Sequence, residues 1–192
     1  MRSLIWGAGA IGGTLGAYLA RAGGDLTMVD TVVEHVDAIT RGGLHVTGPI
    51  DEFAVRVPAF TPQTLRGVWD EIILATKAHH TASAVHALLP HLAAGGYVVS
   101  AQNGLNELAI AEVVGAGRTI GAFVNFGADY LEPGVIHYAG HGAVVDATLR
   151  GVGVHDQRLA SRRPHGLDQV AGGDLGGVPQ RRRGGREARR PH

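Results

Sequence analysis

The feature that most constrains the fold of this chain is a glycine-rich motif, GAGAIG, at residues 7–12. It follows a short apolar run at residues 3–6 and precedes the stretch 11–21, where apolar residues recur at helical spacing. The pair Gly23-Gly24 ends that stretch. A strand, a glycine loop and a helix in this order are typical of a βαβ unit that binds a dinucleotide.

Each glycine of the motif has an expected role at the pyrophosphate of a dinucleotide. Gly7 makes the tight turn, Gly9 lets the backbone approach the phosphates, and Gly12 lets the helix pack closely on the strand. The helix N-terminus also presents free N–H groups to the anion. The residues of this loop that we expect to contact the cofactor are Gly7, Ala8, Gly9, Ala10, Ile11 and Gly12.

Asp30 closes the second apolar run, at residues 26–29, and lies where dinucleotide-binding folds place a ribose-binding carboxylate. A carboxylate there accepts hydrogen bonds from the ribose hydroxyls and repels a 2′-phosphate. Thr31 and Val32 follow it, so no adjacent arginine reverses this choice. NAD(H) is therefore favoured, with NADP(H) as the alternative. A second interpretation stays open, in which the glycines form only a tight turn and Asp30 caps the next helix.

Apolar runs and helical patterns alternate along most of the chain. This alternation predicts an α/β fold, Rossmann-like and doubly wound, with a mostly parallel sheet. The expected helices cover residues 11–21, 31–39 (capped by Thr31), 79–92 and 106–114. The expected strands cover residues 3–6, 26–29, 71–75, 97–100, 119–126 and 135–138, with two short strands between 44 and 57 around a turn at Gly48-Pro49.

Polar side chains follow two of the later strands. Lys77, the only lysine, comes after the strand at 71–75, and Asn103 comes after the strand at 97–100. Ligands of open α/β sheets bind at the carboxyl ends of the strands, where an ammonium can meet a carboxylate or phosphate oxygen. A solvated surface lysine, and a helix cap or turn at Asn103, are the alternatives.

At these residues the chain resembles the ketopantoate reductase family. The matching motifs, in order over about residues 1–145, are GAGAIGG at 7–13, ATKAHHT at 75–81, QNGLNE at 102–107, PGVIH at 133–137 and GHG at 140–142. The resemblance implies a cytoplasmic oxidoreductase of pantothenate biosynthesis that transfers hydride from a nicotinamide to the ketone of a 2-oxo acid. It also implies that Lys77 and Asn103 line the cleft and contact both cofactor and substrate.

The sequence departs from the family in two ways. Members that use NADPH usually carry an arginine just after the second strand, where this chain has Asp30. The family also has a second, helical domain that supplies the catalytic lysine, and nothing after residue 148 resembles it. Lys77 belongs to the first domain, so we assign no catalytic residue. The chain is expected to be the cofactor-binding domain, inactive in hydride transfer by itself. A non-catalytic nucleotide-binding or partner-binding module is the alternative.

Composition divides the chain into residues 1–148, a dinucleotide-binding domain, and a Gly/Arg-rich tail, residues 149–192. Up to Leu149 there are 7 basic and 13 acidic residues, and from Arg150 on there are 10 basic and 4 acidic residues. All ten aromatic residues lie at or before Tyr138. We expect the tail to be disordered, and its composition favours the hypothesis of a frameshift or truncation near residues 145–150.

Other functional classes are disfavoured. The absence of cysteine excludes disulfides and thiolate catalysis, and no apolar run is long enough to span a membrane. The glycines of the first helical stretch argue against a signal peptide. The histidines His79, His80, His86 and His91 lack metal-binding spacing, so we expect solvated side chains and no metal. We expect no nucleic-acid partner, and we expect self-association through exposed apolar surface, with residues 120–126 as an exposed or edge element.

Overall fold

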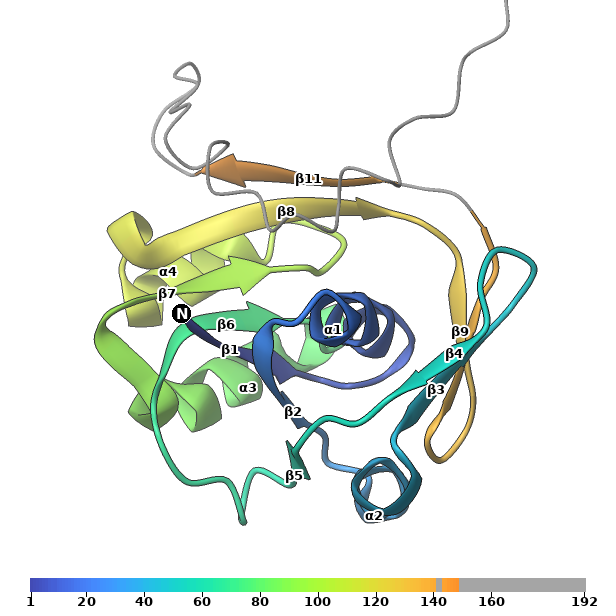
Figure 1. The fold of residues 1–192 in the computed structure, drawn as a ribbon. Helices are drawn as coiled ribbons and strands as arrows, with labels where there is room; N and C mark the ends of the chain where they lie inside the picture. Colours follow the sequence, from blue (N-terminus) through green and yellow to red (C-terminus); the bar gives the residue numbers. More distant parts are fainter. Residues whose placement is uncertain (141–142, 149–192) are drawn as a thin grey trace, which may run out of the picture.

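The computed structural model describes residues 1–140 and 143–148, and its centre is a seven-stranded sheet (Figure 1). Strands β1, β2, β5, β6, β7 and β8 run parallel, and β11 is antiparallel to β8. The predicted mostly parallel, doubly wound sheet is therefore confirmed. In spatial order the strands are β5 (Ala59–Phe60), β2 (Asp25–Val29), β1 (Arg2–Trp6), β6 (Trp69–Leu74), β7 (Leu92–Ser100), β8 (Thr119–Asn125) and β11 (Ala143–Thr148).

Helices cover both faces of this sheet. Figure 1 shows α1 (Ala10–Arg21) on one side and α3 (Thr81–Leu88) and α4 (Glu107–Val114) on the other. The helix α2 (Val33–Gly42) packs against β5. Short 3₁₀ turns are η1 (Ala78–His80), η2 (Leu89–His91) and η3 (Ala116–Arg118).

A second, four-stranded sheet lies beyond α1 (Figure 1). Its order is β4 (Phe53–Val55), β3 (Leu44–Thr47), β10 (Val135–Tyr138) and β9 (Ala128–Glu132). β3 pairs with β10 in parallel, and the two outer strands are antiparallel to their neighbours. The packing on α1 is close, because a Cβ atom added to Gly13 would overlap the side chain of Ile136. The helix α1 is thus enclosed between two sheets.

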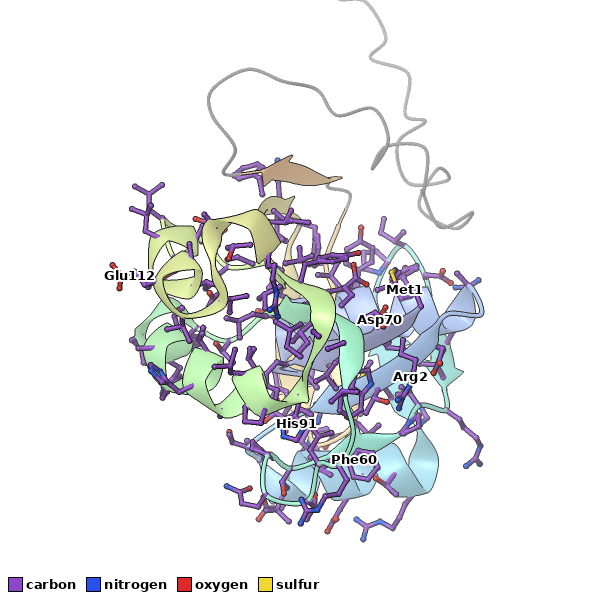
Figure 2. All side chains as sticks on the ribbon, turned by 90° about the vertical axis from the view of Figure 1, so that its left-hand side faces the viewer. Met1, Arg2, Phe60, Asp70, His91 and Glu112 are labelled. Atoms are coloured by element: carbon purple, nitrogen blue, oxygen red, sulfur yellow. The ribbon has the colours of Figure 1, made fainter. Side chains whose placement is uncertain are left out.

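The central strands are buried on both faces, which explains their continuous apolar sequences. In β1, Ile5 belongs to the apolar cluster around α1, whereas Leu4 and Trp6 belong to the cluster under α3 and α4. In β6, Ile73 faces α1 and Ile72 faces the other cluster. The amino-terminal ends of these strands meet at the surface, where the Arg2 N–H donates to Asp70 at 2.8 Å and the two residues lie near Met1 (Figure 2).

Several local predictions were wrong. The segment expected as one helix at 79–92 is helical up to His91 but divided, because the 3₁₀ turns η1 and η2 flank α3 and β7 begins at Leu92. α2 begins at Val33 with no side-chain cap, so Thr31 is not its cap. Residues 120–126 do not form a sheet edge, since β8 lies between β7 and β11, although Phe123 is 63% exposed. The strands β5, β9 and β11 were not predicted.

The prediction of a disordered or frameshifted tail at 149–192 lies outside the described residues. The domain boundary at 148 therefore stays a prediction. Within residues 1–140 and 143–148, no helix is long and apolar enough to cross a membrane.

Candidate functional site

The candidate site lies where the chain connections leave the sheet in opposite directions. β1 and β6 are adjacent and parallel, but β1 continues into α1 on one face and β6 leads to α3 on the other. A crevice outside the carboxyl ends of the strands is expected at such a switch point. The predicted residues follow four strands at this edge of the sheet, namely Gly7 after β1, Asp30 after β2, Lys77 after β6 and Asn103 after β7.

The glycine loop is anchored to the end of β2. The N–H groups of Gly7 and Ala8 both donate to the carbonyl of Val29, at 2.8 and 3.2 Å. Gly7 has φ +100°, a conformation that favours glycine. A Cβ atom on Gly7 would also lie 3.0 Å from the backbone nitrogen of Thr76, so the turn is pressed against the end of β6.

The other two glycines of the motif meet different surroundings. A Cβ atom on Gly12 would overlap the Gly7 carbonyl and lie 2.9 Å from both Ala75 Cβ and Ile5 Cγ2, whereas a Cβ atom on Gly9 would meet nothing within 4 Å. Gly12 therefore allows the close packing of α1, and Gly9 leaves open space at the N-terminus of α1. Helix α1 begins at Ala10 with no side-chain cap, so its first-turn N–H groups have no partner within the helix. This arrangement fits an anionic pyrophosphate.

Asp30 stands at the rim of a hollow beside the glycine loop. The hollow is small, with a volume of about 50 Å³, and is lined by Trp6, Gly7, Val29, Asp30, Thr31, Pro62 and Thr76. Asp30 is half-buried, and its Oδ1 accepts a hydrogen bond of 3.0 Å from the N–H of Val32. This bond fixes the carboxylate at the start of α2, so the two interpretations of Asp30, a ribose acceptor and a helix-end residue, are compatible in one conformation.

Lys77 and Asn103 lie at the same edge of the sheet, but neither lines this hollow. Both residues are exposed. Lys77 precedes η1 in an extended conformation, and the carbonyl of Asn103 accepts a hydrogen bond of 2.9 Å from the Asn106 side chain. The structure thus groups Gly7 with Asp30, and it leaves Lys77 and Asn103 on the exposed loops that follow β6 and β7.

Gln102 connects these two loops, and the sequence analysis assigned it no role. Its side chain is 5% exposed. The amide nitrogen donates to the carbonyl of Thr76 at 2.8 Å, to the hydroxyl of Thr76 at 3.2 Å and to the hydroxyl of Thr81 at 3.0 Å. Thr76 and Gln102 directly precede Lys77 and Asn103, so these bonds set the relative position of the two loops. The only sequence signal is a polar residue two positions after the apolar strand at 97–100, which does not reveal its partners.

The histidines differ from one another in their surroundings. His79, His80 and His86 are exposed, as expected. His91 is not a solvated helix-face residue, because it is half-buried, with ring centroids 6.1 Å from Trp6 and 6.0 Å from Trp69, and its Nδ1 lies 3.0 Å from the Gly67 carbonyl. No group of three or more metal-ligating side chains occurs within the described parts of the chain.

A comparison with protein-family models matches residues 3–150 to ketopantoate reductase PanE/ApbA. Among curated proteins, the 2-dehydropantoate 2-reductase of Pyrococcus abyssi is 38% identical over 151 residues, which cover 76% of this chain and 47% of that protein. The 2-dehydropantoate 2-reductase of Halobacterium salinarum is 32% identical, with 84% of this chain and 53% of that protein covered. The chain spans about half the length of these relatives.

Solved structures agree with this grouping. The 2-dehydropantoate 2-reductase of Geobacter metallireducens GS-15 superposes with a TM-score of 0.74 at 28% identity, covering 84% of this chain and 54% of that one. A D-mandelate dehydrogenase solved with NADH and anilino(oxo)acetate superposes with a TM-score of 0.75 at 25% identity, covering 84% and 51%. In both cases the similar region is about half of the solved protein's chain.

Proposed function

Since the chain belongs to the ketopantoate reductase family, we propose that its described part binds a nicotinamide dinucleotide and forms the cofactor-binding half of a 2-oxo acid reductase. The observation that carries this proposal is the glycine loop at the switch point of the sheet. There Gly7 and the carboxylate of Asp30 line one hollow. The N-terminus of α1, at Ala10, follows shortly after Gly7, and a Cβ atom on Gly9 would meet nothing within 4 Å. The family match favours this function over a non-catalytic module.

In this proposal the chain's own residues bind and orient, and the bound nicotinamide supplies the hydride. The N–H groups at the start of α1 hold the pyrophosphate, and Asp30 accepts hydrogen bonds from the adenosine ribose. We propose that Lys77 and Asn103, on the exposed loops after β6 and β7 at the same edge of the sheet, contact the cofactor and the substrate. An ammonium and an amide suit the carboxylate and ketone of a 2-oxo acid such as 2-dehydropantoate. We assign no general acid among the described residues, so we expect binding without efficient hydride transfer.

The carboxylate of Asp30 is the reason for the proposed preference for NADH over NADPH. The adenosine ribose of NADH carries a free 2′-hydroxyl, which can donate to a carboxylate, whereas the 2′-phosphate of NADPH would lie against the same negative charge. The bond from Val32 to Oδ1 holds the carboxylate in place without neutralising it. We propose NADH as the preferred cofactor and NADPH as the weaker ligand.

The experiment that tests cofactor binding is a titration of the full 192-residue chain with NADH and NADPH, followed through tryptophan fluorescence. Trp6 lines the hollow, so it reports ligand at that place, and a Trp69→Phe variant removes the second tryptophan. We expect saturable quenching by NADH at lower concentrations than by NADPH. Addition of 2-dehydropantoate to the NADH complex is expected to leave the NADH unoxidised. Absence of saturable quenching would exclude the proposed function.

The variant Asp30→Asn tests the origin of the preference, with Asp37→Asn on the exposed face of α2 as the matched control. Removing the charge at position 30 should reduce the ratio of the NADPH to the NADH dissociation constant by roughly tenfold, since the repulsion disappears while a hydrogen-bonding amide remains. The control should leave the ratio unchanged. An unchanged ratio in Asp30→Asn would show that another residue selects the cofactor.

The remaining parts of the functional assignment are predictions from the sequence and the family. They are a cytoplasmic location, a role in pantothenate biosynthesis, self-association through exposed apolar residues, and the absence of a nucleic-acid partner. Leu105 and Leu108, which are 84% and 61% exposed beside Asn103, are the residues through which we expect association.

A further inference from the structure

His35 lies on α2, and its side chain is 0% exposed. Its Nε2 lies 2.9 Å from the carbonyl oxygen of Ala8, and the backbone N–H of Gly134 donates to its Nδ1 at 2.9 Å. A backbone N–H can only donate, so Nδ1 is the ring nitrogen without a proton. The proton is therefore on Nε2, which donates to Ala8. Both ring nitrogens of this buried side chain therefore form hydrogen bonds, with Nε2 as a donor and Nδ1 as an acceptor.

The bond to Ala8 acts on the dinucleotide loop itself. Ala8 directly precedes Gly9, and the carbonyl of one residue and the N–H of the next belong to one planar trans peptide, in which they point in opposite directions. A donor that holds the Ala8 carbonyl toward α2 therefore directs the Gly9 N–H away from α2. A Cβ atom added to Gly9 would meet nothing within 4 Å, so the chain is open at this residue. His35 thereby determines the direction of one N–H of the anion-binding loop.

The bond from Gly134 connects this loop to the second sheet. Gly134 lies in the turn between β9 and β10, has φ +80°, and would place a Cβ atom 3.0 Å from Ala38 Cβ on α2. The ring of Tyr130, on β9, contacts the imidazole edge-on with centroids 5.0 Å apart. The turn is therefore packed tightly on α2, and it holds His35 from the side opposite to Ala8.

We propose that His35 is a positioning residue for the cofactor, which links the β9–β10 turn to the glycine loop and directs the Gly9 N–H toward the pyrophosphate of the dinucleotide. This inference rests on the proposed function, because it requires that the loop binds a dinucleotide. It goes further by giving the second sheet a part in cofactor binding. His35 itself does not contact the cofactor.

Two substitutions separate the two bonds. The amide group of His35→Gln can reach the position of Nε2 and donate to Ala8, but it leaves the Gly134 N–H unpaired. The amide group of His35→Asn can reach the position of Nδ1 and accept from Gly134, but it leaves the Ala8 carbonyl without its donor. The matched controls are His86→Gln and His86→Asn on α3, an exposed histidine on the other face of the sheet.

The NADH dissociation constants of these full-length variants test the inference. We expect His35→Asn to bind NADH roughly five- to tenfold more weakly, and His35→Gln to stay within about twofold of the unsubstituted chain, while thermal unfolding shows both destabilised. A role in stability alone would not separate the two variants in affinity. Equal affinities, a weaker His35→Gln, or loss of the fold in both variants by circular dichroism would overturn the proposal.

Hydrogen exchange of the free chain tests the same inference without the cofactor. The amides of Ala8 and Gly13 are bonded to the carbonyls of Val29 and Gly9. We expect them to exchange faster in His35→Asn than in His35→Gln, because only the first variant releases the loop. Equal exchange in both variants would refute the positioning role. A chain that fails to bind NADH, but shows this difference in exchange, would refute the proposed function and not the link through His35.

Discussion

At the scale of single residues, Gly9 and Gly12 show that one motif can contain two physically different requirements. Both lie at the start of α1, yet a methyl group would enter open space at Gly9 and collide with the Gly7 carbonyl at Gly12. The Gly7 carbonyl belongs to a backbone segment that is held by the hydrogen bond from Gly7 N–H to Val29. Moving this segment aside would cost folding free energy. Gly12 is therefore a packing residue, and Gly9 is a residue that we propose for the binding surface.

Alanine substitutions should separate these two requirements. Gly12→Ala should lower the free energy of unfolding by about 1–3 kcal/mol, because the added methyl group overpacks the contact between α1 and β1. Gly9→Ala should leave stability within about 0.5 kcal/mol and weaken NADH binding, because its methyl group points into the space that we assign to the pyrophosphate. Urea denaturation and NADH titration of both variants measure the two effects. Equal stability of the two variants would contradict this division.

Sequence patterns correctly placed the glycine loop and Asp30 at the ends of adjacent strands, because these positions depend on neighbours in sequence, whereas their binding roles stay predictions. They did not identify His35 or Gln102. The partners of His35 are up to 99 residues away, and those of Gln102 are up to 26 residues away. A single histidine in a helix or a glutamine after a strand carries no local pattern that reveals such partners. The structure was needed to find these buried polar contacts.

At the scale of elements, the loops after β6 and β7 depend on each other through Gln102. Gln102→Ala should cost about 1–3 kcal/mol of stability, because the Thr76 carbonyl and the Thr81 hydroxyl would lose a buried donor. Asn103→Ala, at the neighbouring exposed position, should change stability by less than about 0.5 kcal/mol. Thermal and urea unfolding of the Gln102→Ala and Asn103→Ala variants would measure this difference in stability. An unchanged free energy of unfolding in Gln102→Ala would mean that the two loops keep their positions without the Gln102 side chain.

The contact between α1 and the second sheet should be sensitive to high pH. Tyr18 on α1 meets Phe53 and Tyr138 edge-on, and burial, with Asp51 next in effect, raises the pKa of Tyr18 to about 12. The folded state keeps this phenol protonated above its ordinary pKa of about 10, so the associated stability is complete below pH 10. It is lost as the pH rises toward 12. Unfolding free energies from pH 9 to 12 should fall less steeply in Tyr18→Phe, and equal slopes would contradict this assignment.

At the scale of the whole molecule, alternating apolar patterns predicted the large parallel sheet and the helices on its two faces. The second sheet could not be assembled in the same way. β3 and β10 pair in parallel although they are far apart in sequence, for example His45 with Val135, and β9 is mostly exposed and lacks an apolar pattern. The sequence predicted β3, β4 and β10 as strands but contained no local indication that they share a sheet over α1. That sheet places Gly134 against His35.

The measurement that most directly tests the central claim is amide chemical-shift mapping of the ¹⁵N-labelled full chain during titration with NADH. The account predicts the largest shifts at Gly9, Ala10, Ile11 and Gly12, with further shifts at Asp30 and Thr76 around the hollow. It predicts small shifts at the opposite edge of the sheet, where Arg2 meets Asp70. Shifts that are absent, or that cluster away from the carboxyl ends of β1, β2 and β6, would contradict a dinucleotide site at the glycine loop.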